Sequence, residues 1–80
     1  MSTTKKEELP LYLMQFWALD ESRVTFRTDL IVRVREGDPR AKTTIICSRG
    51  PDGKLQEVTV KRAYIEVLTE WEFKLRGMGI

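Results

Sequence analysis

The stretch RVTFRTDLIVRVR, from Arg23 to Arg35, decides the fold of this chain. Residues of two kinds alternate along it, and only Ile31 breaks the alternation. One parity is largely apolar and comprises Val24, Phe26, Thr28, Leu30, Val32 and Val34. Because successive side chains of a strand point to opposite faces of the sheet, this pattern predicts a β-strand with one apolar face and one arginine-rich face.

A straight strand of this length would be too long for the molecule. At roughly 3.3 Å per residue the strand would reach about 40 Å. A compact domain of this size has a radius of gyration of only about 12 Å. We therefore expect a bend or bulge near Thr28 and Asp29, where the sequence is least apolar.

The preceding segment, residues 10–19 (PLYLMQFWAL), has a single polar side chain, Gln15, and shows neither a helical nor a strand period. Its aromatic content, and the short turn from Asp20 to Ser22 that follows, favour a strand paired with residues 23–35 as a hairpin. A short helix with Pro10 in its first turn is the alternative. In either form the segment is apolar on both sides and must be covered.

Two further strands are expected downstream. Residues 41–48 are rich in β-branched side chains; Ile45 and Cys47 would face inward, and Ile46 would be exposed or lie in a bulge. The loop 49–54 contains Pro-Asp-Gly, which suits a type I turn closed by a left-handed glycine. Residues 54–60 then return as a strand that places Val58 and Val60 on one side.

The C-terminal segment predicts a helix over residues 61–76. Its apolar positions fall within an arc of roughly 140° at 100° per residue, interrupted only by Lys74. Two large apolar residues, Ile65 and Phe73, fall on the polar side of this helix. The predicted fold class is α+β: an antiparallel β-meander of three to four strands with one C-terminal amphipathic helix packed on the sheet. We expect residues 1–8 to form a disordered tail and residues 9–80 to form a single domain.

Composition restricts the classes of function. The chain has 80 residues, a formal charge of only +2 and no long apolar run. A dedicated nucleic-acid-binding protein usually has a stronger basic excess, and the longest near-apolar run, residues 9–19, is about half of what a membrane span needs. With one cysteine and no signal peptide visible, we expect a cytoplasmic protein that does not enter a membrane.

Catalytic chemistry has little support. The chain has no histidine, the commonest general base and transition-metal ligand, and its single cysteine, Cys47, cannot form a zinc site. The acidic residues of the turns are explained by turn formation and solubility. We expect no enzymatic activity, no catalytic residue, no metal and no cofactor.

Two surfaces are candidates for binding. The first is a basic face that could meet phosphates or acidic proteins through guanidinium groups; it comprises Arg23, Arg27, Arg33, Arg35, Arg40, Lys42 and Arg49. The alternative without a binding function is a solvated sheet surface on which Glu57 and other acids pair with the arginines across strands.

The second candidate is a surplus of large apolar residues on outward positions, which also include Ile31 and Ile46. Such a surplus in so small a domain usually marks a protein interface; the expected anchors are Tyr12, Phe16, Ile65 and Phe73. The leading hypothesis is a non-catalytic protein-binding module, an inhibitor, adaptor or assembly subunit, that self-associates as a dimer. The alternative is nucleic-acid binding through the basic face.

Overall fold

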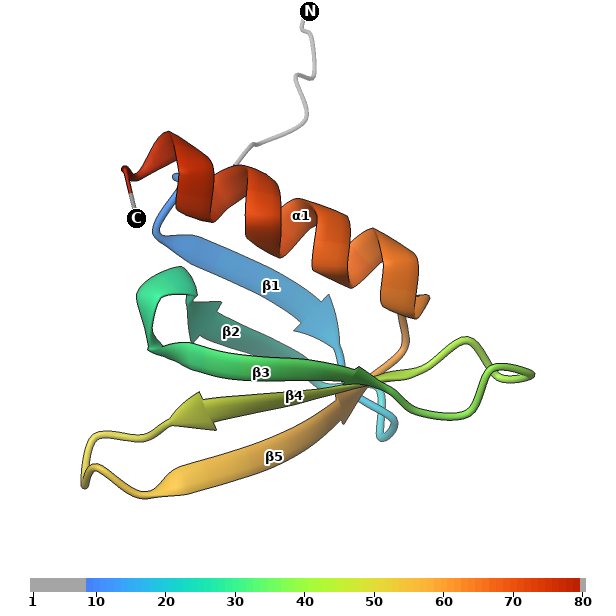
Figure 1. Cartoon of the computed structure of the whole chain (residues 1–80). Coiled ribbons are helices and arrows are strands. Elements are labelled where there is room, and N and C mark those ends of the chain that lie inside the picture. The colour runs from blue at the N-terminus through green and yellow to red at the C-terminus, as the bar shows by residue number, and fades with distance from the viewer. Residues whose placement is uncertain (1–8, 80) are drawn as a thin grey trace, which may run out of the picture.

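The computed structural model describes residues 9–79, so the tail expected over residues 1–8 lies outside the described residues. Within residues 9–79 five antiparallel strands are followed by one helix (Figure 1). Their bounds are β1 Leu13–Trp17, β2 Arg23–Arg27, β3 Ile31–Glu36, β4 Thr44–Arg49, β5 Leu55–Val60 and α1 Tyr64–Gly77. The predicted α+β class, an antiparallel sheet with a C-terminal helix, is confirmed.

The segment 10–19 is a strand, not a helix. β1 pairs with β2 as a hairpin in which Leu13 lies opposite Arg27 and Trp17 opposite Arg23. Pairing resolves the uniformly apolar segment into two sides, because Met14 and Phe16 become buried while Trp17 stays half exposed. The carboxylate of Asp20 accepts hydrogen bonds from the backbone N–H and the hydroxyl of Ser22, which fixes the turn between the strands.

The bend predicted near Thr28 and Asp29 is confirmed. One 3-10 turn, η1 (Thr28–Leu30), divides residues 23–35 into β2 and β3. The buried hydroxyl of Thr28 donates to the carbonyl of Leu11 at 2.7 Å, and the indole N–H of Trp71 donates to the carbonyl of Thr28 at 3.3 Å. The bend is therefore tied both to the approach to β1 and to α1.

β3, β4 and β5 form a three-stranded meander. The prediction that Ile31 and Ile46 point outward is wrong, because their exposed fractions are 5% and 0%. A register shift between Ile31 and Arg33 reverses the side-chain parity, turning Ile31 inward and leaving Val32 exposed. In β4 the inward parity is that of Ile46, which pairs with Val34 on one side and Val58 on the other.

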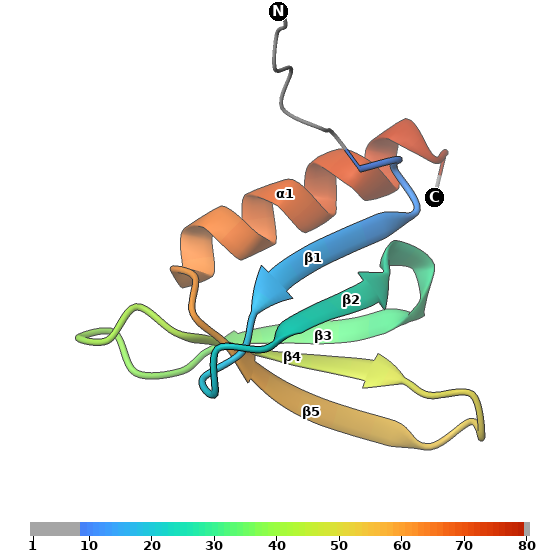
Figure 2. The ribbon, with the colours of Figure 1, turned by 180° about the vertical axis from the view of Figure 1, so that it is seen from behind.

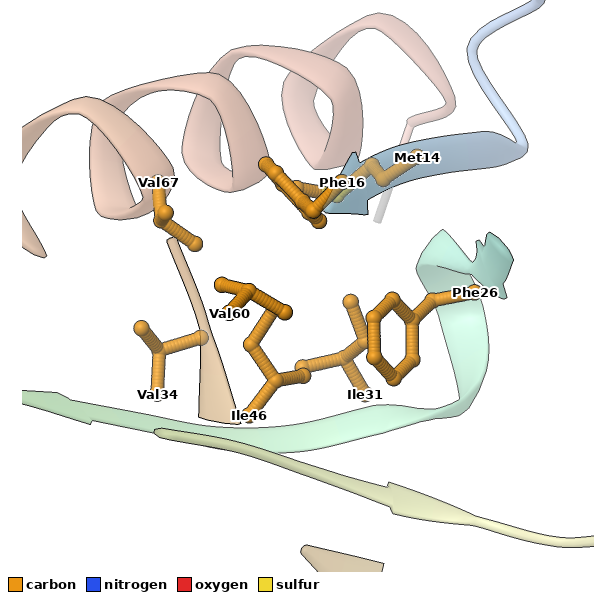
Figure 3. Close-up of a cluster of buried hydrophobic side chains, with 8 residues drawn as sticks. All are labelled: Met14, Phe16, Phe26, Ile31, Val34, Ile46, Val60 and Val67. Atoms are coloured by element: carbon orange, nitrogen blue, oxygen red, sulfur yellow. The ribbon is translucent and has the colours of Figure 1, made fainter. Parts of the chain in front are cut away.

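The two sheets meet at one corner, where Ala18 bridges to Val60 and the N–H of Lys61 donates to the carbonyl of Trp17 at 2.7 Å. Figures 1 and 2 show α1 lying along β1, on the side of the molecule away from the β4–β5 hairpin. The core lies between helix and sheets and receives side chains from both (Figure 3): Met14, Phe16, Phe26, Ile31, Val34, Ile46, Val60 and Val67.

The helix begins at Tyr64, three residues later than predicted. Residues 61 and 62 are engaged otherwise: the N–H of Lys61 bonds to β1, and the carbonyl of Arg62 accepts the buried hydroxyl of Thr44 at 2.6 Å. Lys74, which interrupts the predicted apolar arc, is 8% exposed and faces the body of the protein. The arc therefore describes the buried side of the helix correctly, with one lysine included.

Candidate functional site

The four expected apolar anchors do not share one surface. Phe16 is wrong as an anchor, because it is 3% exposed and packs in the core against Phe26, with ring centroids 6.2 Å apart. Tyr12, before β1, is 53% exposed. Ile65 and Phe73 on α1 are the two most exposed large apolar residues described, at 64% and 66%.

Ile65, Thr69 and Phe73 form a stripe along the outward side of α1. Residues four apart lie one above another on a helix, and all three of these are exposed. They line a shallow, mainly apolar hollow of about 440 Å³, and a second hollow continues from Phe73 to Leu9 and Leu11. We call these five residues, Ile65, Thr69, Phe73, Leu9 and Leu11, the α1 patch.

Charges at the rim of the α1 patch are paired within the helix. The guanidinium of Arg62 lies 2.7 Å from the carboxylate of Glu66, and the ammonium of Lys74 lies 3.6 Å from the carboxylate of Glu70. The rim therefore presents little net field toward an approaching surface. Lys74 is mainly structural, since its ammonium also donates to the carbonyls of Leu13 and Pro10 at 2.5 and 3.4 Å.

The basic face separates into three groups. In the first, Arg33 and Arg35 of β3 share Glu57 of β5, at 3.6 and 2.8 Å. This arrangement is the cross-strand pairing expected of a solvated sheet surface without a binding function. The hydrogen bond from Arg35, together with its charge, holds the pKa of Glu57 below its usual value, and the pKa of Arg35 is raised correspondingly.

The second group surrounds a groove between the β1–β2 hairpin and the β4–β5 hairpin, of about 490 Å³. We call it the β2 groove; its lining includes Arg23, Thr25, Arg27, Arg49, Gln56 and Val58, and no lining residue is acidic. Arg27 pairs with nearby Asp29 at 2.9 Å. Among residues 9–79, Arg23 and Arg49 have no acidic partner; Arg49 donates to the carbonyl of Gly53 at 3.1 Å.

The third group lies around the loop between β3 and β4. Lys42 has a left-handed backbone (φ 55°) and lines a hollow together with Lys61 and Arg62. Those two cations are already paired, with Glu21 and Glu66. Arg40 lies in the same loop, where its backbone N–H donates to the carboxylate of Asp38.

Two features of these surfaces were missed by the sequence reasoning. The guanidinium of Arg23 lies over the ring of Trp17, 4.5 Å from its centroid, so an aromatic residue does accompany the arginines. The hairpin register predicts this neighbour, because Trp17 and Arg23 are symmetric about the Asp20 turn. Cys47 was expected to face the core, but it lies on the outer face and is buried where Arg33 and Glu57 meet across it.

Comparison of the chain with protein-family models, with curated proteins and with solved structures finds no match. Within the part of the chain that the structure describes, no helix has the length and apolar character needed to span a membrane. The same residues contain no group of three side chains arranged to hold a metal ion.

Proposed function

We propose that this chain is a non-catalytic protein-binding module that self-associates through the α1 patch. The observation that carries the proposal is the stripe of Ile65, Thr69 and Phe73 on the solvent side of a helix whose opposite side is already committed to the core. Full burial of Ile65 and of Phe73 would each stabilise an interface by roughly 1.5–3 kcal/mol. A domain of this size has a thin core and gains from such burial.

The paired charges around the α1 patch favour a second copy of the chain as the molecule that binds there. Because Arg62 and Lys74 neutralise Glu66 and Glu70 within the same helix, two copies can approach without strong like-charge repulsion. In a twofold arrangement centred on the small Thr69, Ile65 of each copy would meet Phe73 of the other, or its own equivalent if the helices run parallel. Either packing buries the stripe against itself.

The test is sedimentation equilibrium of the wild type, Phe73→Glu and Leu55→Glu. Phe73→Glu should remain folded, because the side chain is 66% exposed, and should weaken dimerisation at least tenfold. Leu55, 55% exposed at the start of β5, is the matched control, and its variant should dimerise like the wild type. A wild type that stays monomeric at several hundred micromolar, or equal dimerisation of all three proteins, would contradict the proposal.

Nucleic-acid binding is the second candidate, and the contact of Trp17 with Arg23 favours it, since aromatic and guanidinium groups together can stack on bases. The neutralisation of Arg33 and Arg35 by Glu57 weakens it. This candidate requires affinity for single-stranded DNA or RNA that falls steeply with salt and with Arg23→Glu, and falls further with the double replacement Arg33→Glu and Arg35→Glu. Fluorescence anisotropy with a labelled oligonucleotide measures both dependences.

A further inference from the structure

We propose that the β2 groove binds an extended, acidic segment of a partner protein, which adds to the free edge of β2 as a further strand. This surface is separate from the α1 patch, since the residues that line the two have no member in common. Binding of a partner segment at the β2 groove is therefore independent of self-association through the α1 patch.

The hydrogen-bond pattern identifies which backbone groups of β2 are free. The N–H of Thr28 donates to the carbonyl of Tyr12, and that of Ala18 donates to the carbonyl of Ser22. Bonded and non-bonded pairs alternate along an antiparallel ladder, so the residues of β2 bonded to β1 are Val24 and Phe26. The N–H and C=O groups of Arg23, Thr25 and Arg27 consequently point away from β1, and within residues 9–79 no other strand pairs with them.

The outer edge of β1, by contrast, is covered by other parts of the chain. Its outer carbonyls are used, that of Trp17 by the N–H of Lys61 and that of Leu13 by the ammonium of Lys74. Within residues 9–79, the outer edge of β2 has no equivalent cover, and the residues of β2 line the β2 groove. An exposed strand edge is a template for another strand, and extended peptides bind many domains in this way.

Side chains around this edge define the chemistry of the added strand. Outward side chains of the added strand would lie beside Arg23 and Arg27, with Arg49 across the groove, and no lining residue is acidic. Arg27 already pairs with Asp29, and the guanidinium of Arg23 donates to the amide oxygen of Gln15. Arg23 and Arg49 therefore carry the charge that has no acidic partner within residues 9–79. Inward side chains would lie beside Val24 and Phe26 and over Val58. A segment that alternates acidic and small apolar residues complements both sides.

A second copy of β2 is a poor occupant of the same edge. If two β2 strands paired around a twofold axis at Thr25, Arg23 of one copy would lie opposite Arg27 of the other. Like charges directly opposite on neighbouring strands are destabilising. The arginines therefore oppose edge-to-edge self-pairing and favour an acidic partner.

The test uses a fluorescein-labelled peptide of alternating glutamate and valine, Gly-Glu-Val-Glu-Val-Glu-Gly, and the full chain. We expect saturable binding that Arg23→Glu with Arg49→Glu weakens at least tenfold. The pair Arg33→Glu with Arg40→Glu makes the same change of charge on other surfaces and should alter affinity less than twofold. Phe73→Glu should bind the peptide like the wild type, which separates this inference from the dimer.

Amide hydrogen exchange provides the readout specific to strand addition. The amides of Arg23, Thr25 and Arg27 should exchange quickly in the free protein and become protected with peptide, whereas those of Val24 and Phe26 should be protected in both states. Absence of binding at millimolar peptide, binding without this protection, or protection given by a poly-thymidine oligonucleotide instead of the peptide would overturn the inference.

Discussion

The side chain of Lys74 supplies hydrogen bonds to backbone carbonyls that a neighbouring strand would usually supply. Its stem passes through the apolar side of α1, and its ammonium donates to the carbonyl of Leu13 at 2.5 Å and to that of Pro10 at 3.4 Å. Lysine stems commonly pack along apolar surface while the charged group reaches polar partners. The helix is thereby fastened to the edge of β1.

Replacement of Lys74 by methionine should therefore destabilise the protein. The stem packing is kept, but the carbonyl of Leu13 loses its buried partner, at a cost of about 1–3 kcal/mol. Urea denaturation of Lys74→Met measures the loss, and Lys54→Met, in the exposed β4–β5 loop, is the matched control. A midpoint unchanged from the wild type would show that the ammonium contributes nothing net.

The burial of an individual strand side chain could be predicted only where the alternation of apolar and polar residues was unambiguous. Val34 and Phe26 follow from alternation, and both are buried. Ile31 does not, because the register shift beside it reverses which face it meets. Phe16 lies in a segment with no polar side, so the choice between Phe16 and Trp17 as the buried residue is made by pairing with β2 and not by the segment itself.

At the scale of elements, the outer face of the three-stranded sheet is held by one acid between two arginines. Glu57 on β5 reaches across β4 to Arg35 and Arg33 on β3. All three side chains are well exposed, so each contact contributes modestly and is screened by salt. Their position nevertheless covers Cys47, which is 2% exposed on that face.

The pairing of Glu57 predicts a specific pH dependence. Arg35 holds the pKa of Glu57 below its ordinary value of 4.5, so the folded state binds this proton less readily than the unfolded chain. The contribution of Glu57 to stability is therefore complete above the ordinary value and is lost as pH falls through the lowered one. Glu57→Gln should be less stable than the wild type at pH 7, with the difference shrinking toward pH 3.

Urea midpoints of both proteins at the two pH values check this expectation. Asp20, whose pKa is also lowered, by hydrogen bonds from Ser22, is present in both proteins and cancels in the comparison. A difference that grows on acidification would contradict the assignment of the pair.

The order of elements was predictable from local patterns because each has its own signal. Alternation, the Pro-Asp-Gly turn and the helical arc lie within short windows, and the left-handed Gly53 (φ 82°) stands where the turn requires it. The way in which the two sheets meet was not predictable, since it depends on the long-range bridge from Ala18 to Val60. The separation of the basic face into groups was not predictable either, because β2 and β3, on either side of η1, belong to different sheets.

At the scale of the whole molecule, the two proposed surfaces belong to different parts of the fold. The α1 patch lies on the outward side of the helix, and the β2 groove opens between the two hairpins. Self-association through the first would leave the second accessible. A dimer would then present two grooves, and a partner with two acidic segments would bind more tightly than one with a single segment.

Disulfide crosslinking of Thr69→Cys tests whether copies of the chain meet through the α1 patch. Thr69 is exposed at the centre of the stripe, and the native Cys47 is buried. A residue on the twofold axis meets its own equivalent, so Thr69→Cys should form a crosslinked dimer under mild oxidation at micromolar concentration. It should do so much faster than Ala41→Cys in the exposed β3–β4 loop; equal rates for the two variants would contradict the claim.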